Sequence, residues 1–253
     1  MTDALMTEEK NSIVEVNLPS VEKMVEAGAH FGHKTSSWNP KIEQYLFGTR
    51  NGIHVFDVEK TLRKMEEAIM FMARVLSNGG KVLFVGTKPA AKTIITVSAK
   101  ELNLPYVANR WLGGTLTNYK TISKRIQYLK DLEEQQATGQ WDKFTKKERL
   151  MLQRKMEKLQ GQMAGIRDLN KLPEAVLVTD VKVDNIAVRE AKIMKIPVIA
   201  ICDTNMNPVG IDYVIPANDD ATSSLKILLA TITDNLKNVK PVIKMAEKKE
   251  KEV

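Results

Sequence analysis

Short runs that are apolar at nearly every position recur along the chain, separated by longer stretches with a helical period. The clearest runs are KVLFVGT (81–87), AVLVTD (175–180) and PVIAICDT (197–204), which are rich in β-branched residues and end in small or polar ones. Strands that are apolar on both faces are typical of a parallel sheet covered by helices on each side. Further strand candidates are GIHVFD (52–57), PYVAN (105–109) and YVIPAN (213–218).

The stretches with a helical period are residues 58–77, 89–102, 184–195 and 221–237. They alternate with the apolar runs, and no repeat of solenoid length interrupts that order. Alternation of strand and helix predicts a doubly wound α/β domain with a mainly parallel sheet, of the flavodoxin-like or Rossmann-like kind.

Several helix ends are marked by residues that suit them. Ser20 is a candidate N-cap, and Gly28 a candidate C-terminal end, for a short helix in LPSVEKMVEAG. Asp184 is a candidate cap for the helix that follows it, and Asp220 or Thr222 for the last helix.

The alternation breaks between residues 118 and 165, where apolar residues recur at intervals of three and four. One series is Ile122, Ile126 and Leu129, and a second is Leu152, Met156, Leu159 and Met163. This is coiled-coil spacing. The connection QQATGQWDKF contains a glycine, and the TKKE that follows it fits a capping box that starts a new helix. We therefore expect an antiparallel coiled-coil helical hairpin inserted into the α/β domain.

This pattern divides the chain into four parts. We expect a flexible leader at 1–17, an α/β domain built from 18–117 and 166–237, the hairpin insertion at 118–165, and a charged tail at 238–253. Neither a signal peptide nor an apolar run of the roughly 18 residues that a membrane span needs is recognisable. The sequence therefore predicts a cytoplasmic protein with no membrane partner.

Charge adds a partner class to this picture. The chain has 38 Lys and Arg against 31 Asp and Glu, a net charge of +7, and a pI of about 9.3. Between residues 120 and 167 there are twelve Lys or Arg and six Asp or Glu, so most of the surplus lies on the expected hairpin. A rigid basic arm can meet successive phosphates, which favours RNA or another polyanion as partner.

Enzymatic motifs are missing from the sequence. It has no GxGxxG fingerprint, no P-loop and no GxSxG elbow. Cys202, the single cysteine, lies in an apolar run, so we expect it to be buried and not a nucleophile. The turn GTKP contains Lys88 and could hold a phosphate at a helix N-terminus, more readily one of RNA than of a free nucleotide. We expect no catalytic residue, cofactor or small-molecule substrate; a nucleotide-binding enzyme that uses this turn is the alternative.

The histidines and some aspartates raise the question of a metal. His30 and His33 are closely spaced, and Asp180, Asp184 and Asp203 follow strand candidates whose carboxyl ends a fold could gather. No HExxH motif or nearby cysteine supports a metal site, so a structural or RNA-contacting role is favoured and no metal is expected.

Two segments suit nucleic-acid contacts. HFGHKTSSWNPKI (30–42) combines donors, a tryptophan and a helix-forbidding Asn-Pro, so we expect an exposed loop. FGTRNGIH (47–54) places Arg50 beside a turn-forming Asn-Gly. Packing of Trp38 at the edge of the core is as compatible with the sequence as a contact to RNA. For the hairpin, docking to another protein alone is a further alternative to RNA binding.

The segment RWLGGTLTNYK (110–120) marks the junction between sheet and hairpin. We expect its glycines to allow a tight turn, with Gly113→Val more damaging than the loss of one charge. Thr117 or Asn118 is expected to cap the outgoing helix, and Trp111 to pack at the base of the hairpin.

Several segments together resemble one family. AGAHFGHKTSSWNPKI, YLFGTRNGIHVFDVEKT, NGGKVLFVGTK, NRWLGGTLTNYKTI, FTKKERLMLQRKMEKL, GIRDLNKLPEAVLVTD and IPVIAICDTNMNPVGIDYVIPANDDA, in this order, are similar to the bacterial-type small-subunit ribosomal protein S-two family. The resemblance runs from about residue 18 to about residue 237, nearly the whole chain.

The resemblance implies a non-enzymatic component of the small ribosomal subunit. Members of the family combine a doubly wound domain with a protruding coiled-coil hairpin, bind small-subunit rRNA between head and body, and help dock ribosomal protein S-one beside other small-subunit proteins. With Lys88 of the GTKP turn added, the candidate RNA contacts are Lys34, Trp38, Asn39, Arg50, Lys88, Arg110, Asn118, Lys120, Lys124, Arg125, Lys143, Lys146, Lys147, Arg149, Arg154 and Lys155.

Overall fold

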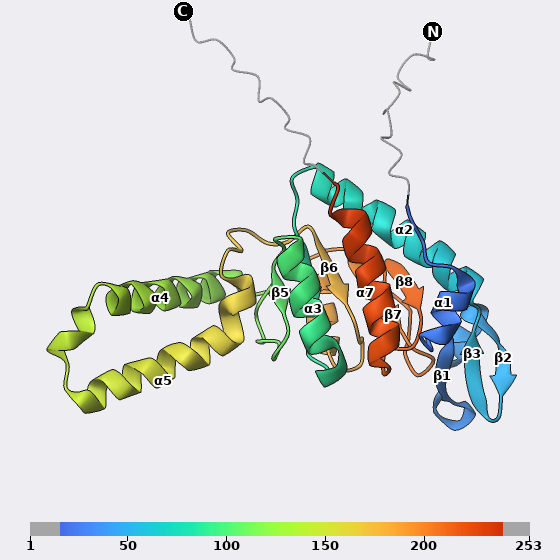
Figure 1. Ribbon diagram of the computed structural model, residues 1–253, viewed down its shortest axis with the longest axis horizontal. Coiled ribbons are helices and arrows are strands. Elements are labelled where there is room, and N and C mark those ends of the chain that lie inside the picture. The colour runs from blue at the N-terminus through green and yellow to red at the C-terminus, as the bar shows by residue number, and fades with distance from the viewer. Residues whose placement is uncertain (1–15, 240–253) are drawn as a thin grey trace, which may run out of the picture.

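A five-stranded parallel sheet forms the centre of the protein (Figure 1). The computed structural model describes residues 16–239, so nearly all of the expected leader and tail lies outside the described residues. The strand order is β5-β4-β6-β7-β8, with every neighbouring pair parallel. The strands are β4 (Val82–Val85), β5 (Tyr106–Val107), β6 (Ala175–Val178), β7 (Val198–Cys202) and β8 (Tyr213–Pro216).

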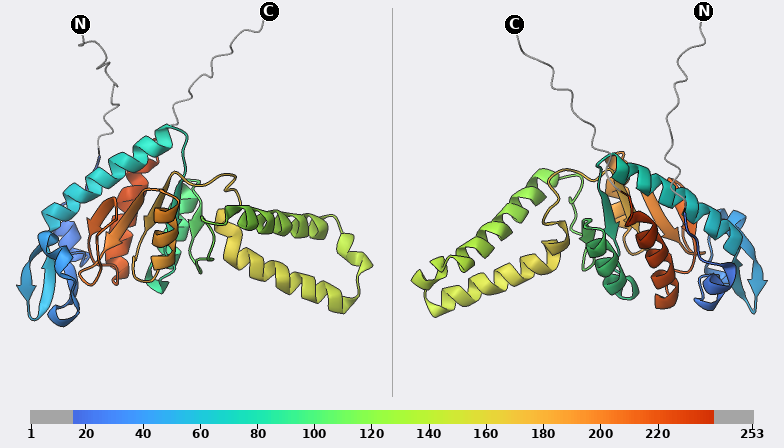
Figure 2. Two further views of the ribbon diagram at one scale, coloured as in Figure 1. Left: turned by 180° about the vertical axis from the view of Figure 1, so that it is seen from behind. Right: turned by 45° about the horizontal axis from the view of Figure 1, so that its top comes forward.

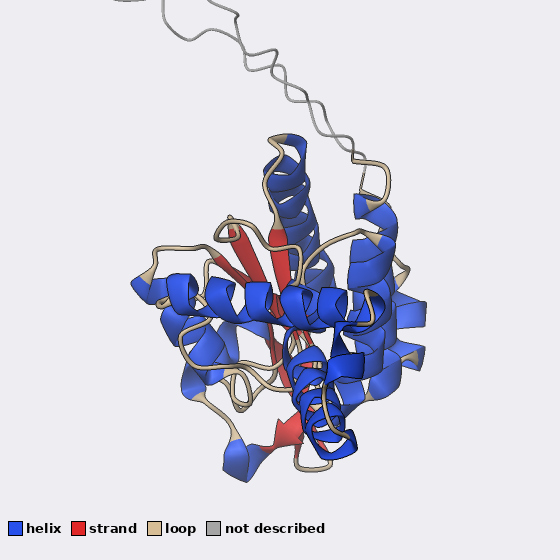
Figure 3. Ribbon diagram, turned by 90° about the vertical axis from the view of Figure 1, so that its left-hand side faces the viewer, coloured by secondary structure: helices blue, strands red, loops and turns tan. Residues whose placement is uncertain are grey.

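Helices cover both faces of this sheet, which is consistent with the doubly wound α/β fold that the sequence predicts (Figure 3). Alternate residues of each strand face opposite cores: Val82 and Phe84 pack with one set of helices, Leu83 and Val85 with the other. The first set is α2 (Val58–Ser77), α3 (Pro89–Glu101) and α7 (Thr222–Leu236). The opposite face carries the shorter α6 (Asn185–Ile193) (Figure 2, left).

A small antiparallel sheet and a short helix lie at one end of the molecule. Helix α1 (Val21–Glu26) precedes strands β1 (Phe31–Lys34), β2 (Leu46–Arg50) and β3 (Ile53–Phe56), in the order β1-β3-β2. Residues 52–57 therefore do not join the parallel sheet. Their burial alternates along β3, as expected for a strand with one face toward the core.

The expectation of an exposed loop at residues 30–42 is wrong in part, because this segment contains strand β1. The rest is two short 3-10 helices, η1 (Thr35–Ser37) and η2 (Pro40–Tyr45). Asn51 and Gly52 join β2 to β3 with φ angles of 51° and 74°. Positive φ at both positions is what a two-residue hairpin turn requires, and Asn-Gly is the pair that best tolerates it.

Of the three helices with an expected N-cap, α1 has the side-chain cap that the sequence predicts, whereas α6 and α7 do not. The Ser20 hydroxyl accepts a hydrogen bond from the Lys23 amide and begins α1, as expected. Asp184 makes no cap hydrogen bond, and the residue before α7 is Ala221, with neither Asp220 nor Thr222 in that role. The Asp184 carboxylate instead accepts hydrogen bonds from the amide and hydroxyl of Thr87, and the Asp220 carboxylate pairs with Lys88.

Two long helices project from the α/β domain at the end opposite the small sheet (Figure 1). They are α4 (Tyr119–Ala137) and α5 (Lys146–Met163), joined through η3 (Gln140–Lys143) and followed by η4 (Ala164–Ile166). We call residues 119–163 the arm. The helices contact each other, and their buried side chains include Ile122, Ile126 and Leu129 of α4 and Met156 and Met163 of α5.

The turn between the two helices is stabilised by its own side chains. Thr145 and Glu148 form the expected capping box: the Glu148 amide donates to the Thr145 hydroxyl and the Thr145 amide to the Glu148 carboxylate.

None of the helices in residues 16–239 is long and apolar enough to cross a membrane.

Candidate nucleic-acid interface

The loop before α4 closes around one carboxylate. Glu190 stands on the sheet-facing side of α6, and one of its oxygens accepts hydrogen bonds from Trp111 Nε1 at 3.0 Å and from the Gly114 amide at 2.8 Å. The other accepts from the Leu116 amide at 3.0 Å and from the Thr117 amide and hydroxyl, both at 3.1 Å. Five donors from one loop therefore converge on a single side chain.

The chemistry of this contact favours the ionised acid. Burial raises the pKa of Glu190, but the hydrogen bonds from Trp111, Gly114, Leu116 and Thr117 outweigh it, and the pKa lies below its ordinary value. Glu190 is not among the candidate residues that the sequence indicates. One signal for it is present in the sequence. Glu190 shares the buried side of the α6 helical period with Ala187, Val188 and Ala191, so it is an acid at a buried position.

The loop itself differs from the expectation in two respects. Gly114, not Gly113, has a left-handed backbone, with φ of 88°, while a Cβ on Gly113 would meet nothing within 4 Å. Neither Thr117 nor Asn118 caps α4 through its side chain, because the Thr117 hydroxyl donates to Glu190 and the Asn118 side chain makes no cap hydrogen bond. Trp111 is buried at the base of the arm, as expected.

The returning end of the arm is attached to the edge of the sheet. The Asn109 side chain donates to the carbonyl of Gly161, and the Tyr119 hydroxyl to the carbonyl of Leu169. Gly165 lies against the carbonyl and ring of Tyr106 in β5 so closely that a Cβ would overlap them. The arm is thus held at its base from both sides.

Basic side chains cover the outside of the arm. Lys120 and Lys124 are four residues apart on one face of α4, and Lys147 and Arg154 are seven apart on one face of α5. All four are exposed, as are Arg125, Lys143 and Lys146. Within the described chain, none of these seven enters an ion pair, unlike Lys130 and Arg167, which pair with Asp168 and Glu133.

Two other candidate arm contacts already have partners. Arg149 is half-buried and lies 3.1 Å from the Asp142 carboxylate. Lys155 Nζ donates to the Tyr128 hydroxyl at 2.8 Å and lies 4.6 Å from the centre of that ring. Arg110 and Asn118 are exposed at the base of the arm, so they continue the same surface.

Four further candidates lie around the small sheet, at the opposite end of the molecule from the arm (Figure 1). Lys34 and Arg50 are exposed on β1 and β2. Trp38 is half-buried with its ring centre 4.6 Å from that of His54, and Asn39 caps η2 by accepting from the Lys41 amide. The candidate RNA contacts therefore form two separate groups.

Lys88 belongs to neither group. Its ammonium lies 3.1 Å from Asp180, 2.8 Å from Asp219 and 2.6 Å from Asp220, at the carboxyl ends of β6 and β8. Burial lowers its pKa, but the three carboxylates raise the pKa above its ordinary value overall. We expected Lys88 to meet an RNA phosphate; three aspartates already neutralise its charge, so we exclude it from the interface.

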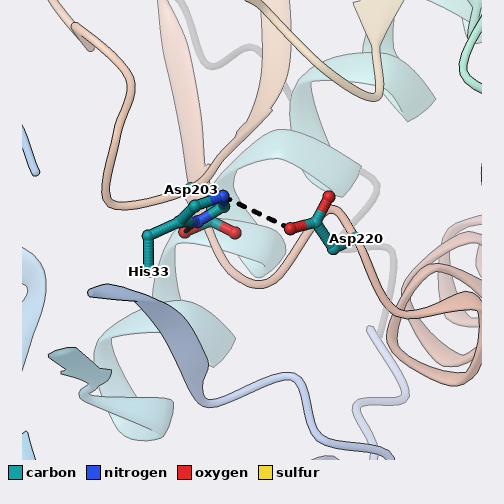
Figure 4. A group of neighbouring side chains, drawn as sticks. All are labelled: His33, Asp203 and Asp220. Carbon is teal, nitrogen blue, oxygen red and sulfur yellow. Dashed lines mark ion pairs between the residues drawn. The ribbon is translucent and has the colours of Figure 1, made fainter. Parts of the chain in front are cut away.

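The same cluster connects the small sheet to the parallel sheet. His33 of β1 lies with Nδ1 3.0 Å from Asp203, which follows β7, and with Nε2 3.3 Å from Asp220 (Figure 4). The hydrogen bond that His33 donates to the Asp203 carboxylate raises the pKa of His33, and burial raises the pKa of Asp219 to about 7. The aspartates that follow the strands are gathered here, as their positions indicate, except that Asp184 instead accepts from Thr87.

Among the described residues, one group of side chains could hold a cation: His33, Asp203 and Asp220 each offer a ligand atom within 4.8 Å of the others. His30 is not part of this group. The Lys88 ammonium already lies against Asp220, so it supplies the positive charge at this place.

Comparison with known proteins adds a family to this geometry. A family model described as ribosomal protein S2 matches residues 24–238. A curated relative, the small ribosomal subunit protein uS2 of Hahella chejuensis (strain KCTC 2396), is 47% identical over 216 residues, which cover 85% of each chain.

Proposed function

The chain belongs to the ribosomal protein S2 family, and we propose that it binds small-subunit rRNA mainly through its arm. As a member of this family it is a structural, non-enzymatic protein of the small ribosomal subunit that acts in translation, with rRNA and other small-subunit proteins as partners. We further propose that it lies in the cytoplasm on that subunit, between head and body.

The observation that supports the arm as the RNA-binding element is its set of cations that form no ion pair with any residue the structure describes. Exposed lysines and arginines along two rigid helices keep their full charge available, and each phosphate that they neutralise releases counterions. We interpret residues 118–165 as a coiled-coil hairpin inserted between the two parts of an α/β domain, 18–117 and 166–237. Such an arm can reach RNA without rearrangement of the core.

A second RNA contact is proposed at the small sheet, through Lys34, Trp38, Asn39 and Arg50. Backbone phosphates suit the two cations, whereas the exposed part of Trp38 offers a surface on which a base can stack. Because this group lies at the other end of the molecule, the chain would contact RNA at two places and connect them.

The docking of ribosomal protein S-one is proposed at the exposed apolar side chains beside this second contact. Phe47 of β2 is 82% exposed, and Phe31, Val21 and Val25 are also exposed on β1 and α1. In the order β1-β3-β2, one edge of β2 pairs with no other described strand, and a segment of another protein can add main-chain hydrogen bonds there. Apolar side chains next to an open edge suit a protein partner better than a phosphate backbone.

Sedimentation with small ribosomal subunits tests the main proposal. The chain should co-sediment with subunits in low salt and be released as salt rises, because counterion release drives binding. A variant with Lys120, Lys124, Lys147 and Arg154 changed to Ala should be released at lower salt than the wild type. A wild-type chain that sediments free of subunits at every salt concentration would rule the proposal out.

Nuclease treatment separates the RNA proposal from a pure protein-docking role. Complexes held by rRNA should fall apart when the RNA is digested, whereas complexes held only by protein contacts should survive. The nucleotide-binding alternative loses its basis, since Lys88 of the GTKP turn is occupied by aspartates.

A further inference from the structure

All hydrogen bonds that the loop of residues 111–117 makes to distant parts of the described chain end on one side chain, Glu190. Its other hydrogen bonds are local turns, such as the one from the Thr115 amide to the Leu112 carbonyl. Apolar packing of Trp111 and Leu116 also stabilises the loop, but it constrains the orientation of the loop little. Hydrogen bonds to a charged group are directional and about twice as strong as neutral ones.

The loop also decides where the arm points, because α4 begins directly after it at Tyr119. Helix α4 has 19 residues, which makes it about 28 Å long. For such a lever, a change of about 10° at the base displaces the tip by about 5 Å. A charge-assisted hydrogen bond to a phosphate needs a distance of about 2.8 Å, so a tip displaced this far loses its contacts.

The arm has a second attachment on its returning side, where Gly165 lies against Tyr106. One attachment leaves a helical hairpin free to swing, whereas two separate attachments define a direction. Glu190 of α6 provides one of these attachments, and Tyr106 at the β5 edge of the sheet provides the other.

We propose that Glu190 is the positioning residue of the arm: by holding the 111–117 loop it fixes the angle at which α4 and α5 leave the α/β domain. This inference deepens the proposed function and rests on it in one respect, that the fixed angle sets the basic residues against rRNA. Glu190 itself touches no RNA and acts through the loop.

A distance measurement in the RNA-free protein tests the inference. Spin labels are placed on cysteines at Gln136, near the tip of the arm, and at Thr93 on α3, both exposed. The native Cys202 is buried and will not be labelled. The wild type should give one narrow distance distribution. Glu190→Gln should broaden it or shift it by about 5 Å, while circular dichroism shows that both helices remain folded.

Two further variants separate positioning from a loss of folding. Trp111→Phe removes one of the five donors and keeps an aromatic, though smaller, ring, so it should broaden the distribution less than Glu190→Gln does. Glu26→Gln changes an exposed carboxylate on α1 and should leave the distribution unchanged. A narrow, unshifted distribution in both Glu190→Gln and Trp111→Phe would overturn the inference.

Binding to purified small-subunit rRNA, measured on the same variants, distinguishes this inference from the proposed function. Glu190→Gln should bind roughly tenfold more weakly than the wild type at equal folded fraction, as the loss of one or two phosphate contacts predicts. A broadened distribution with unchanged RNA affinity would overturn the link between arm direction and RNA. A wild type that binds no RNA would overturn the proposed function, while the distances still decide whether Glu190 directs the arm.

Discussion

The buried carboxylate of Glu190 stabilises the junction between the α/β domain and the arm. In Glu190→Gln, an amide NH₂ group replaces one carboxylate oxygen. This group is itself a donor, so it cannot accept hydrogen bonds from the N–H groups that it faces. We expect a loss of about 3 kcal/mol in the free energy of unfolding, measured by urea denaturation. Glu26→Gln, on an exposed site, should change it by less than about 0.5 kcal/mol; an equal effect in both variants would contradict the assignment.

The pH dependence of stability gives a second test of the same group. Since the folded-state pKa of Glu190 lies below its ordinary value of 4.5, its stabilisation is present above 4.5 and is lost as the pH falls through the folded value. The wild type should therefore lose its stability advantage over Glu190→Gln below pH 4.5. Urea midpoints at pH 7 and pH 3.5 measure this, and a constant difference would show that the carboxylate charge does not matter.

Gly114 and Gly113 are adjacent glycines with different roles. Gly114 has φ of 88° and lies close to the Asn118 Cβ, whereas Gly113 has open space and no left-handed backbone. Gly114→Ala should lower the free energy of unfolding by about 1–2 kcal/mol, because a Cβ is strained in this conformation. Gly113→Ala is the matched control and should be nearly neutral. Equal losses in thermal denaturation would show that the loop is not held in this conformation.

At the scale of elements, the cluster around Lys88 and His33 joins the small sheet to the parallel sheet. His33 has a raised pKa, so its stabilisation is present below its ordinary value of 6.5 and is lost as the pH rises through the folded value. Burial raises the pKa of Asp219 from its ordinary value of 3.8 to about 7, so Asp219 costs stability progressively as the pH rises from 3.8 to about 7, and the full cost is present above 7. Both groups make the junction weaker as the pH rises toward 7.

We expect the urea midpoint of the wild type to fall between pH 6 and pH 8, by the equivalent of about 1 kcal/mol. The measurement should contain a chelator, so that no metal contributes. His33→Gln should flatten this dependence, because it removes one of the two titrating groups. A midpoint that rises with pH over this range would contradict the geometry of the cluster.

The arm should act as an electrostatic element. We expect Ala at Lys124, Arg125, Lys146, Lys147, Arg154 or Lys155 to weaken RNA binding about equally for all sequences, and each to reduce the salt slope by about one. Lys155 should have the smallest effect, since it already contacts Tyr128. Lys226→Ala on α7 is the control and should leave the slope unchanged. Six unchanged slopes would show that RNA binds elsewhere.

The elements were predictable where one local rule decided them. Runs such as AVLVTD are apolar on both faces, which is typical of a covered parallel strand, and β6 lies there with every residue buried. β1 was missed because FGHK has no apolar alternation and is held by pairing with β3, a partner more than 15 residues away in the sequence. The caps at Asp184 and Asp220 failed for the same reason: Thr87 and Lys88, distant in sequence, compete for those carboxylates.

At the scale of the whole molecule, the surface charge of the arm was predictable, but its anchoring was not. Exposed lysines follow from composition and helical period, so the candidate contacts on α4 and α5 could be identified residue by residue. The role of Glu190 could not be predicted, because its position among the buried residues of α6 indicates burial but not which segment it contacts. Its role depends on the RWLGGTLT loop folding back over α6, a contact between segments more than 70 residues apart.

The whole-molecule arrangement separates two surfaces by the length of the α/β domain, with the basic arm at one end and exposed Phe47 at the other (Figure 1). A rigid core between them would let one chain hold RNA and a protein partner at the same time. Phe47→Ser should therefore weaken the docking of ribosomal protein S-one and leave rRNA binding intact, as measured by sedimentation of subunits with and without that protein. Loss of both activities together would argue against two separate surfaces.

Cleavage of rRNA by hydroxyl radicals released from the arm tests the central claim most directly. An iron chelate is attached to a cysteine introduced at Ser123 on α4, with Lys226→Cys on α7 as the comparison, since the native Cys202 is buried. In assembled small subunits, the probe at Ser123 should cut the small-subunit rRNA strongly and locally, and the probe at residue 226 should not. Cuts from residue 226 with none from Ser123 would show that the arm is not the surface that binds rRNA.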